Sequence, residues 1–415
     1  MQLRRCIKKN MKILIVNVNA HTGSTGKISY GLYRYLTRHG HEVKLCCRGV
    51  VEPSIDDRNI IAITNKLELY YSSFMSKLTG YEGIHNYFST KKLLNIIRTF
   101  NPDVVQLFNL PGHYVNIFSL LEYLKRHNIN TVYSMMDDYA FAGKCTFVYD
   151  CNKFLTECGH CPYYKDYPFS YFFDFSKSIF KRKKRIYQGF NSLTITGVRW
   201  SCKMAQQSAL TNHLPIVRID HPINYNEVFY PRNVEGLKEK LGIPSSNIVI
   251  LTVTTALFAR KGGYYFVDLA KRLREHKNLT FVFVGYDRTD WELPSNLITI
   301  GFVASQSELA EYYSLADVYI CTSLADTFPT TCLNALGCGT PIIGFKTGGV
   351  PDMAPEPFGK YVEPKDVDTL AVECLKVKAK DKSIIEKTRK YAIASYSEEV
   401  IYEKFLNLYN EKIDE

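Results

Sequence analysis

The stretch 324-LADTFPTTCLNALGCGTPIIGFKTGGVPD-352 is the part of the chain that says most about its fold. It begins with an acidic residue and a short loop containing Pro329, continues as an apolar helix, and ends in a strand followed by two glycines. A turn, a helix start and glycine-rich bends concentrate free backbone N–H groups in one small region. Such groups, together with the positive end of the helix dipole, favour binding of the phosphates of a nucleotide.

The pattern of predicted elements around this stretch indicates an α/β protein with parallel sheets. Short β-rich runs alternate with amphipathic segments, as in repeated βαβ units. In the first half, strands are predicted at 12–18, 42–46, 103–108, 131–135 and 193–196, and helices at 27–37, 91–99 and 115–126. In the second half, strands are predicted at 248–253, 280–284, 297–300, 317–321 and 341–344, and helices at 262–275, 306–314, 331–337, 366–379 and 383–412.

The length of the chain predicts two domains. A chain of 415 residues is too long for one hydrophobic core and suits two domains of roughly 200 residues each. The boundary is expected within 221–233, a segment rich in turn-forming residues. This places an N-terminal domain at 11–221 and a C-terminal domain at 222–382.

The composition is that of an ordinary globular protein, with 46% hydrophobic and 22% charged residues. No apolar run approaches the roughly 20 residues that span a bilayer. Basic residues at 1–10 are followed by an alternating strand from Met11, itself a candidate start, and not by the apolar core of a signal peptide. Because no export signal is predicted, the twelve cysteines are expected in a reducing cytoplasm, as thiols or metal ligands.

Positive charge is concentrated in the first half of the chain. Residues 1–220 contain 30 Lys and Arg against 15 Asp and Glu, whereas residues 221–415 contain 22 against 26. The densest basic run, 181–185, lies close to the aromatic stretch 163–180. Such a surface suits anionic lipid, where each Lys or Arg contributes about 1 kcal/mol, and a solvated helix face is the alternative. Nucleic acid is not an expected partner, because no nucleic-acid-binding motif accompanies the charge.

Four cysteines lie within 17 residues: Cys145, Cys151, Cys158 and Cys161. Four thiolates could close a tetrahedral zinc site and so hold together an otherwise irregular loop. Transient disulfides and unligated thiols are the alternatives. A catalytic zinc is not expected, because four protein ligands leave no open position for a substrate.

The stretch 324–352 resembles the donor-site motif of family-4 retaining glycosyltransferases, in which E-x7-E is followed by A-x-G-x-P-V and G-G-x-P-E. Asp326 takes the first acidic position, and Asn334, eight residues later, takes the second. These enzymes have the GT-B fold, in which two Rossmann-like domains face each other across a cleft, so the resemblance implies that fold here. It also implies that 383–415 returns as a helix to the N-terminal domain, which would hold the acceptor.

The resemblance assigns roles to loops of the second domain. Lys261, with Arg260 beside it, would bind the diphosphate of a UDP- or GDP-linked sugar and stabilise the charge that grows on it. An arginine that the family often has earlier in this loop is absent, with Thr255 near its place. Asp326 would contact the sugar hydroxyls, and Asn334 would hold the ribose hydroxyls as a neutral group. The other implied positions are Phe328, Pro329, Thr330 and Thr331 for the diphosphate and sugar, and Gly301, Phe302 and Val303 for the base.

A glycine-containing loop after the first predicted strand, residues 19–27, is a further candidate. Gly23 and Gly26 would allow a phosphate to approach the backbone closely, and a helix is predicted to start immediately afterwards. The loop is not a Walker motif, because His21 and Ile28 occupy positions that this motif reserves for Gly and for Ser or Thr. We assign Gly23 and Gly26 to the nucleotide sugar, with a purely structural turn as the alternative.

Segments 104–117, 131–145 and 149–170 are similar to bacterial family-4 enzymes of the colanic-acid and capsule type, whose motifs are H-x-H-N, H-D-x-W-A-F-T-G-x-C and C-x-x-W…C-x-x-C-P. Asn109, Asp137 and all four cysteines of the insertion 143–165 match, and the resemblance places Asp137 in the active site. The usual histidines are replaced by Gln106 and Phe108 in the first motif and by Met136 in the second.

Taken together, the resemblance implies retaining transfer of a hexose-type unit from a nucleotide sugar to a lipid-linked or oligosaccharide acceptor, in capsule or lipopolysaccharide biosynthesis. Such an enzyme would be cytoplasmic, peripheral on the inner face of the cytoplasmic membrane. No catalytic metal is expected, because no Asp-x-Asp motif is positioned for one. Met136, Asn334 and the replaced histidines leave two alternatives: a non-catalytic pseudo-glycosyltransferase that partners an active glycosyltransferase, and a GT-B sugar-nucleotide epimerase.

Overall fold

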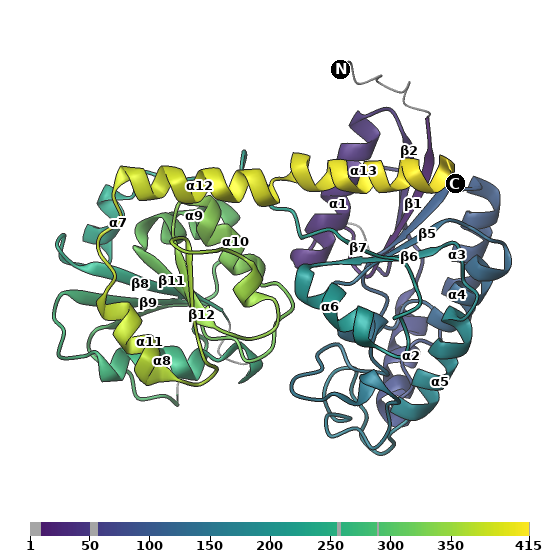
Figure 1. Cartoon of the computed structure of the whole chain (residues 1–415), viewed down its shortest axis with the longest axis horizontal. Helices are drawn as coiled ribbons and strands as arrows, with labels where there is room; N and C mark the ends of the chain where they lie inside the picture. Colours follow the sequence, from purple (N-terminus) through teal and green to yellow (C-terminus); the bar gives the residue numbers. More distant parts are fainter. Residues whose placement is uncertain (1–9, 50–56, 255–258, 289, 415) are drawn as a thin grey trace. The chain divides into compact units, whose positions relative to one another are not determined.

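The chain folds into two compact α/β units (Figure 1). The structure is a computed structural model that describes residues 10–49, 57–254, 259–288 and 290–414. Unit 1 comprises Met1–Asp220 and Tyr402–Glu415, and unit 2 comprises His221–Ile401. Each unit contains its own parallel sheet and its own hydrophobic core.

Unit 1 is built on a seven-stranded sheet in the order β3-β2-β1-β4-β5-β6-β7, and every neighbouring pair is parallel. Most of its strands are short apolar runs buried on both faces, as is typical of parallel sheets. The strand order reverses between β1 and β4, and ligands bind at such switch points, outside the carboxyl ends of the strands. The strands are β1 (Lys12–Asn17), β2 (Glu42–Cys47), β3 (Ile60–Ala62), β4 (Val104–Leu107), β5 (Thr131–Ser134), β6 (Leu193–Gly197) and β7 (Ile216–Arg218).

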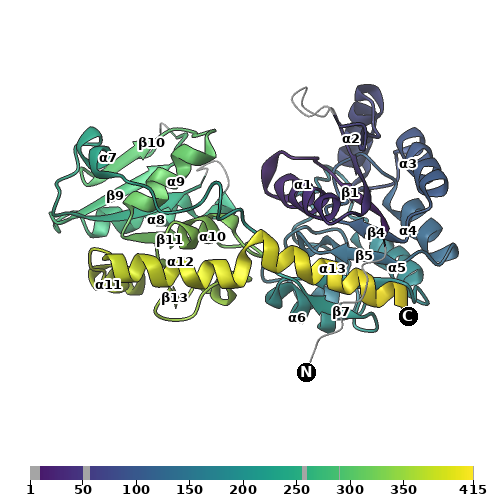
Figure 2. The same ribbon diagram turned by 90° about the horizontal axis from the view of Figure 1, so that it is seen from above.

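Helices pack on both faces of this sheet (Figure 2). They are α1 (Gly23–Arg38), α2 (Lys66–Thr79), α3 (Tyr87–Phe100), α4 (Ile117–Arg126), α5 (Ser176–Tyr187) and α6 (Arg199–Gln207), with 3₁₀ turns η1 (Asp138–Ala140) and η2 (Lys153–Leu155). Apolar side chains of α3 and α4, such as Leu93 and Leu120, join those of the strands in one buried cluster. The core of unit 1 is therefore continuous from the sheet to the helices.

Helix α2 is inverted relative to an ordinary amphipathic helix. Its buried residues are polar: Glu68, Ser72 and Ser76. Four of its large apolar side chains are 56–83% exposed: Leu67, Tyr70, Tyr71 and Phe74. The sequence pattern did not predict this helix, because an apolar face is expected to mark the core side.

Unit 2 is built on a six-stranded parallel sheet in the order β10-β9-β8-β11-β12-β13. The strands are β8 (Ile248–Val253), β9 (Leu279–Val284), β10 (Leu297–Ile300), β11 (Val318–Cys321), β12 (Ile342–Phe345) and β13 (Gly359–Val362). The helices are α7 (Glu235–Lys240), α8 (Gly263–Arg272), α9 (Gln306–Leu315), α10 (Thr330–Gly337), α11 (Val367–Leu375) and α12 (Lys382–Tyr396), with 3₁₀ turns η3 (Ala259–Lys261) and η4 (Val350–Asp352).

The end of the chain differs from the single returning helix predicted at 383–412. The structure has two helices, α12 and α13 (Glu398–Asp414), separated at Ser397, whose backbone is extended and bridges Ile223. Helix α12 belongs to unit 2, because Arg389 donates to the carbonyls of Gly337 and Phe229 at 2.9 and 3.2 Å. From residue 402 onward, α13 belongs to unit 1. The prediction that 383–415 returns as one piece is therefore wrong for its first half.

The ten predicted strands agree with the observed ones to within one residue at either end. Three short strands, β3, β7 and β13, were not predicted. Within the part of the chain that the structure describes, no helix is both long enough and apolar enough to cross a bilayer.

Candidate functional site

Three charged side chains of unit 2 meet at the carboxyl edge of its sheet. Arg260 and Lys261 lie in η3, after β8, and Asp326 lies in the loop after the neighbouring strand β11. Thr255, earlier in the first of these loops, lies outside the described residues. The Lys261 ammonium is ion-paired with Asp326, and Nη1 of Arg260 lies 3.9 Å from the same carboxylate oxygen, Oδ2. With exposures of 24% for Lys261, 26% for Arg260 and 10% for Asp326, the cluster is partly desolvated and still open to a ligand.

Backbone contacts hold these two loops together. The Leu324 N–H donates to the Arg260 carbonyl at 2.7 Å, and the Arg260 guanidinium donates to the Ala325 carbonyl at 3.2 Å. Gly262 has a φ of 67°, and a Cβ atom there would lie 1.9 Å from the Thr322 carbonyl oxygen. Glycine is therefore required where the loops cross.

A pair of glycines, Gly348 and Gly349, follows β12 at the same carboxyl edge of the unit 2 sheet. A Cβ atom on Gly348 would lie 1.9 Å from the carbonyl oxygen of Asp326, and one on Gly349 would lie 1.9 Å from that of Thr327. The Gly349 N–H donates to the Asp326 carbonyl at 3.3 Å. These glycines were not assigned to the site from the sequence, although the G-G pair in the motif was the available signal. Their role is to let a third loop pass closely behind Asp326.

Helix α10 begins directly after the Asp326 loop. Its N-cap is Pro329, which makes no side-chain capping hydrogen bond. The Cys332 N–H donates to the Pro329 carbonyl at 3.0 Å, so the N–H groups of Thr330 and Thr331 are the ones placed for a ligand. Thr330 and Thr331 lie in this turn and are half-buried. The Phe328 ring is buried against the rings of His221 and Tyr396, with centroids 5.5 and 5.6 Å away, so only its backbone is placed to meet a ligand.

Asn334 lies in the second turn of α10 and is 9% exposed. Its side chain neighbours the Tyr313 hydroxyl, whose pKa burial raises well above its usual value. The assignment of Asn334 to a ribose stays a prediction.

Gly301, Phe302 and Val303 follow β10, the edge strand of the unit 2 sheet. They share the carboxyl edge with the charged cluster and lie two strands away from β8. Phe302 is 87% exposed, which leaves its ring able to stack on a planar group. This arrangement suits the predicted contact with a base.

Residues 233–395 match the family model described as glycosyl transferases, group 1. The match covers most of unit 2. A curated relative, the putative colanic acid biosynthesis glycosyl transferase WcaC of Escherichia coli K12, is 20% identical over 96% of this chain and 99% of its own. N-acetyl-alpha-D-glucosaminyl L-malate synthase of Bacillus anthracis is 23% identical over 44% of this chain, so the chain spans half the length of that relative.

Solved glycosyltransferase structures align with 95–98% of the chain at TM-scores of 0.64–0.67. The crystal structure of Anabaena Alr3699/HepE in complex with UDP-glucose is 14% identical and aligns over 97% of this chain and 100% of its own, with a TM-score of 0.64. These likenesses show that the fold is GT-B, as the sequence predicts. The region that matches the family model lies in its second Rossmann-like unit.

Outside the region that matches the family model, Asp137 follows β5 in unit 1. Its Oδ1 atom accepts the Tyr139 N–H at 2.9 Å and so caps η1. Burial raises the pKa of Asp137 to about 6, although the Tyr139 N–H and the charge of Lys183 act in the opposite direction. A carboxyl with such a pKa exchanges its proton near neutral pH, which suits acid–base work.

Gly23 and Gly26 lie at the start of α1 in unit 1. Gly23 has a φ of 68°, and a Cβ atom on Gly26 would lie 3.0 Å from the backbone of His21. Asn17, fully buried at the end of β1, donates to the Asn19 carbonyl at 2.9 Å and fixes the same loop. The glycines therefore serve a tight strand-to-helix turn, and their contact with a nucleotide sugar stays a prediction.

The four clustered cysteines are the predicted zinc ligands. Cys145 and Cys161 bring their sulfur atoms to 3.8 Å of each other. Across the described ranges, however, no group of three or more Cys, His, Asp or Glu side chains is arranged to hold a metal ion. The assignment of zinc to Cys145, Cys151, Cys158 and Cys161 therefore stays a prediction.

Buried lysines hold this irregular segment together. Lys183 is fully buried and donates to the carbonyls of Tyr139 and Ala142. Lys144, 1% exposed, donates to the Tyr164 carbonyl at 2.6 Å. An ammonium group has three donors and can bridge several loop carbonyls, which is the task that zinc was expected to perform. Burial lowers the pKa of Lys183 to about 7.

Proposed function

We propose that this protein is a retaining glycosyltransferase. It moves a hexose-type unit from a UDP- or GDP-linked sugar to a lipid-linked or oligosaccharide acceptor in surface polysaccharide biosynthesis. The observation that carries the proposal is the meeting of Arg260, Lys261 and Asp326 beside the free start of α10. Two cations and a set of backbone N–H groups form a site for a diphosphate, and a carboxylate beside them can accept sugar hydroxyls.

The chemistry that we propose follows from these charges. An acceptor hydroxyl attacks the anomeric carbon from the face that the diphosphate leaves. The bond from that carbon to the phosphate oxygen breaks, and the acceptor proton passes to the departing diphosphate. Lys261 and Arg260 stabilise the negative charge that grows on the diphosphate. In the ligand-free chain Asp326 neutralises Lys261, so donor binding would exchange this ion pair for contacts with phosphate and sugar.

The acceptor side of the proposal belongs to unit 1. Residues 1–220 carry an excess of positive charge, and aromatic side chains of α2 are exposed. Both features suit a protein that works peripherally at the inner face of the cytoplasmic membrane on a lipid-linked acceptor. Asp137, whose pKa is raised to about 6, is the carboxyl that we propose for the acceptor side of the active site.

Calorimetric titration of nucleotide sugars tests the donor site. Lys261→Ala should weaken binding of UDP-glucose or GDP-mannose, whichever the native protein prefers, by at least about 1.5 kcal/mol, because a charge-assisted phosphate contact is lost. The matched control is Lys271→Ala on α8, whose ammonium pairs with Glu292 at 3.7 Å, and it should bind as the native protein does. An unchanged affinity in Lys261→Ala would remove this residue from the site, and failure of every nucleotide sugar to bind would defeat the proposal.

A non-catalytic subunit is the second candidate, favoured by Met136 and Asn334 in place of the family's histidine and acid. Such a subunit would bind the donor but would neither hydrolyse nor transfer the sugar, and it would act with a partner glycosyltransferase. Turnover of the donor by the purified chain alone would exclude this candidate.

A further inference from the structure

A pocket of about 510 Å³ lies in unit 1 at the carboxyl ends of β1 and β2. It is lined by residues 18–22 after β1, by 47–49 at the end of β2, and by Thr64, Asn65, Lys66, Leu69 and Tyr70 before and within the first turns of α2. This volume is within the range of small-molecule sites in proteins. The position beside the β1/β4 switch point is also where sheets of this type bind ligands.

Arg48 gives this pocket a fixed positive charge. Its guanidinium donates to the Gly112 carbonyl at 3.5 Å and to Oδ1 of Asn19 at 3.4 Å, both of which are neutral oxygens. Lys66 adds a second, exposed ammonium group at the start of α2. Among the described lining residues there is no carboxylate, so the pocket is complementary to an anion.

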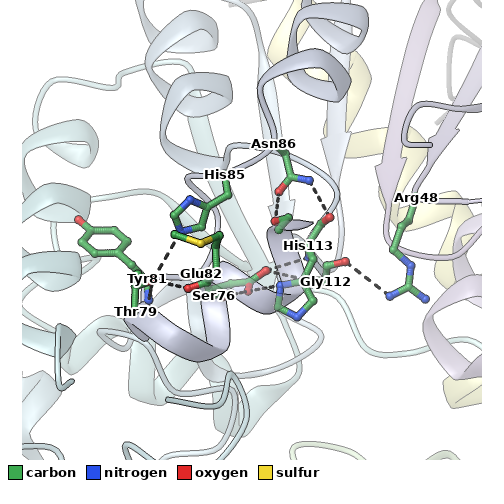
Figure 3. A network of polar contacts seen from close by, with 11 residues as sticks. Arg48, Ser76, Thr79, Tyr81, Glu82, His85, Asn86, Gly112 and His113 are labelled. Atoms are coloured by element: carbon green, nitrogen blue, oxygen red, sulfur yellow. Dashed lines mark hydrogen bonds and ion pairs between the residues drawn. The ribbon is translucent and has the colours of Figure 1, made fainter. Parts of the chain in front are cut away.

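A buried network holds the Arg48 contact in place (Figure 3). The Glu82 carboxylate, 1% exposed, accepts the N–H groups of Gly112 and His113 at 3.0 and 2.9 Å and the Ser76 hydroxyl at 2.7 Å. Gly112 has a φ of 147° and its carbonyl faces Arg48, as Figure 3 shows. The guanidinium therefore lies beside a loop that the core holds in place.

The pocket continues into an apolar surface. Leu69 and Tyr70 of α2 line it, and Tyr70 is 71% exposed. Beyond Tyr70, the outward face of α2 carries Leu67, Tyr71 and Phe74. The Phe88 N–H donates to Glu68 at 2.8 Å, and the Tyr171 N–H donates to the Lys77 carbonyl at 3.0 Å, so the backbones of two further exposed aromatic residues contact α2. Contiguous apolar surface of this kind marks a binding surface in soluble proteins.

We infer that the pocket and the outward face of α2 together bind an amphiphile with a phosphate-bearing head. The head enters the pocket and meets Arg48 and Lys66, and the apolar chain lies along Leu67, Tyr70 and Phe74. This inference rests on the proposed function, because it names the acceptor as a lipid phosphate or diphosphate. It identifies the residues that select such an acceptor.

Binding of geranyl diphosphate tests the head of this site. Titrations are carried out in a Lys261→Ala background, so that capture of the diphosphate by the proposed donor site is weakened. Arg48→Gln should weaken binding at least roughly tenfold, since a charge-assisted contact to phosphate is lost. Lys66→Gln, an exposed position where folding is not at risk, should weaken it severalfold. Arg98→Gln on α3 is the matched control and should leave binding unchanged, because that guanidinium is exposed and donates only to Asn95 among the described residues.

The chain-binding face is tested by comparing geranyl diphosphate with inorganic pyrophosphate and with geraniol. The native chain should bind geranyl diphosphate more tightly than either fragment. Leu67→Ser should remove most of the advantage over pyrophosphate, and Leu375→Ser, an exposed leucine of unit 2, should not.

Three outcomes would overturn the inference. Arg48→Gln and Lys66→Gln could bind the probe as Arg98→Gln does, or Leu67→Ser could behave as Leu375→Ser does. The protein could also bind neutral phosphatidylcholine vesicles as strongly as vesicles that contain a diphosphate lipid, in which case α2 is a general membrane surface. Nucleotide-sugar binding by the native protein is measured in parallel. If nucleotide sugars bind while geranyl diphosphate does not, the inference is wrong and the proposed function stands. If geranyl diphosphate binds while no nucleotide sugar does, the proposed function is wrong and the pocket still binds the probe.

Discussion

Glu82 is buried in unit 1 and yet stays charged, because donors surround its carboxylate. Burial by itself would raise its pKa, but the hydrogen bond and charge of His113, with the Gly112 N–H and the Ser76 hydroxyl, lower the pKa to about 2. His113 lies 2.6 Å from the carboxylate through Nδ1. A carboxylate satisfied in this way fixes the segment after β4 against the last turn of α2, and it does so only in its ionised form.

Replacing this carboxylate should be costly. Glu82→Gln keeps the shape but leaves N–H donors and His113 without their charged partner, so we expect a loss of about 3 kcal/mol in the free energy of unfolding at neutral pH. Because the folded pKa of about 2 lies below the ordinary 4.5, the native contribution is full above pH 4.5 and is lost as the pH falls towards 2. Urea unfolding of both proteins along this range should show a steeper acid loss for the native chain. Glu42→Gln, an exposed partner of Lys12, serves as control and should change stability little.

A side chain at Gly262 should also destabilise the protein, because the φ of 67° and the nearby Thr322 carbonyl leave no room for one. Gly262→Ala should destabilise unit 2 by about 2–4 kcal/mol, from backbone strain and overpacking, and should weaken nucleotide-sugar binding as the Lys261 loop moves. Gly236→Ala, where an added Cβ meets nothing within 4 Å, is the matched control. Equal unfolding midpoints for the two variants would contradict this account of the loop crossing.

At the scale of elements, α2 shows why a helix can escape a sequence pattern. Its inward residues are hydrogen-bonded polar groups: the Ser72 hydroxyl donates to Asn86 at 2.7 Å, and Glu68 accepts N–H groups at the start of α3. Polar partners replace apolar packing on the side that normally carries the hydrophobic stripe. The outward aromatic face then makes no contribution to the core.

This inversion predicts an unusual mutational result. Phe74→Ser should change the free energy of unfolding by less than about 0.5 kcal/mol, because 64% of the side chain is exposed. By contrast, Phe118→Ala, in the buried core, should cost about 3–5 kcal/mol. Chemical denaturation of the two variants beside the native chain measures both values. A cost above 2 kcal/mol for Phe74→Ser would mean that α2 packs with its other face inward.

At the scale of the whole molecule, two units with separate cores predict two coupled but distinguishable unfolding steps. Nucleotide sugar at 100 times its dissociation constant should stabilise the step that belongs to unit 2 by about 2.7 kcal/mol, and should leave the other step nearly unchanged. Calorimetry with and without the ligand measures this, with tryptophan fluorescence as an aid, since Trp200 lies in unit 1 and Trp291 in unit 2. A single step that shifts as a whole would show that the units unfold as one.

The sequence by itself determined the α/β class, ten of the strands and the Arg260–Asp326 part of the site. These features depend on local signals: buried strands are short apolar runs, glycines mark close crossings, and the carboxyl ends of parallel strands meet at one edge. The tertiary structure decided the rest. It showed that buried lysines tie down the segment around Cys145, that the last helix breaks where Ser397 bridges Ile223, and that Arg48 lines a pocket and contacts a loop that Glu82 holds. Each of these depends on which residues distant in sequence come into contact, and the periodicity of a single segment carries no information about its partners.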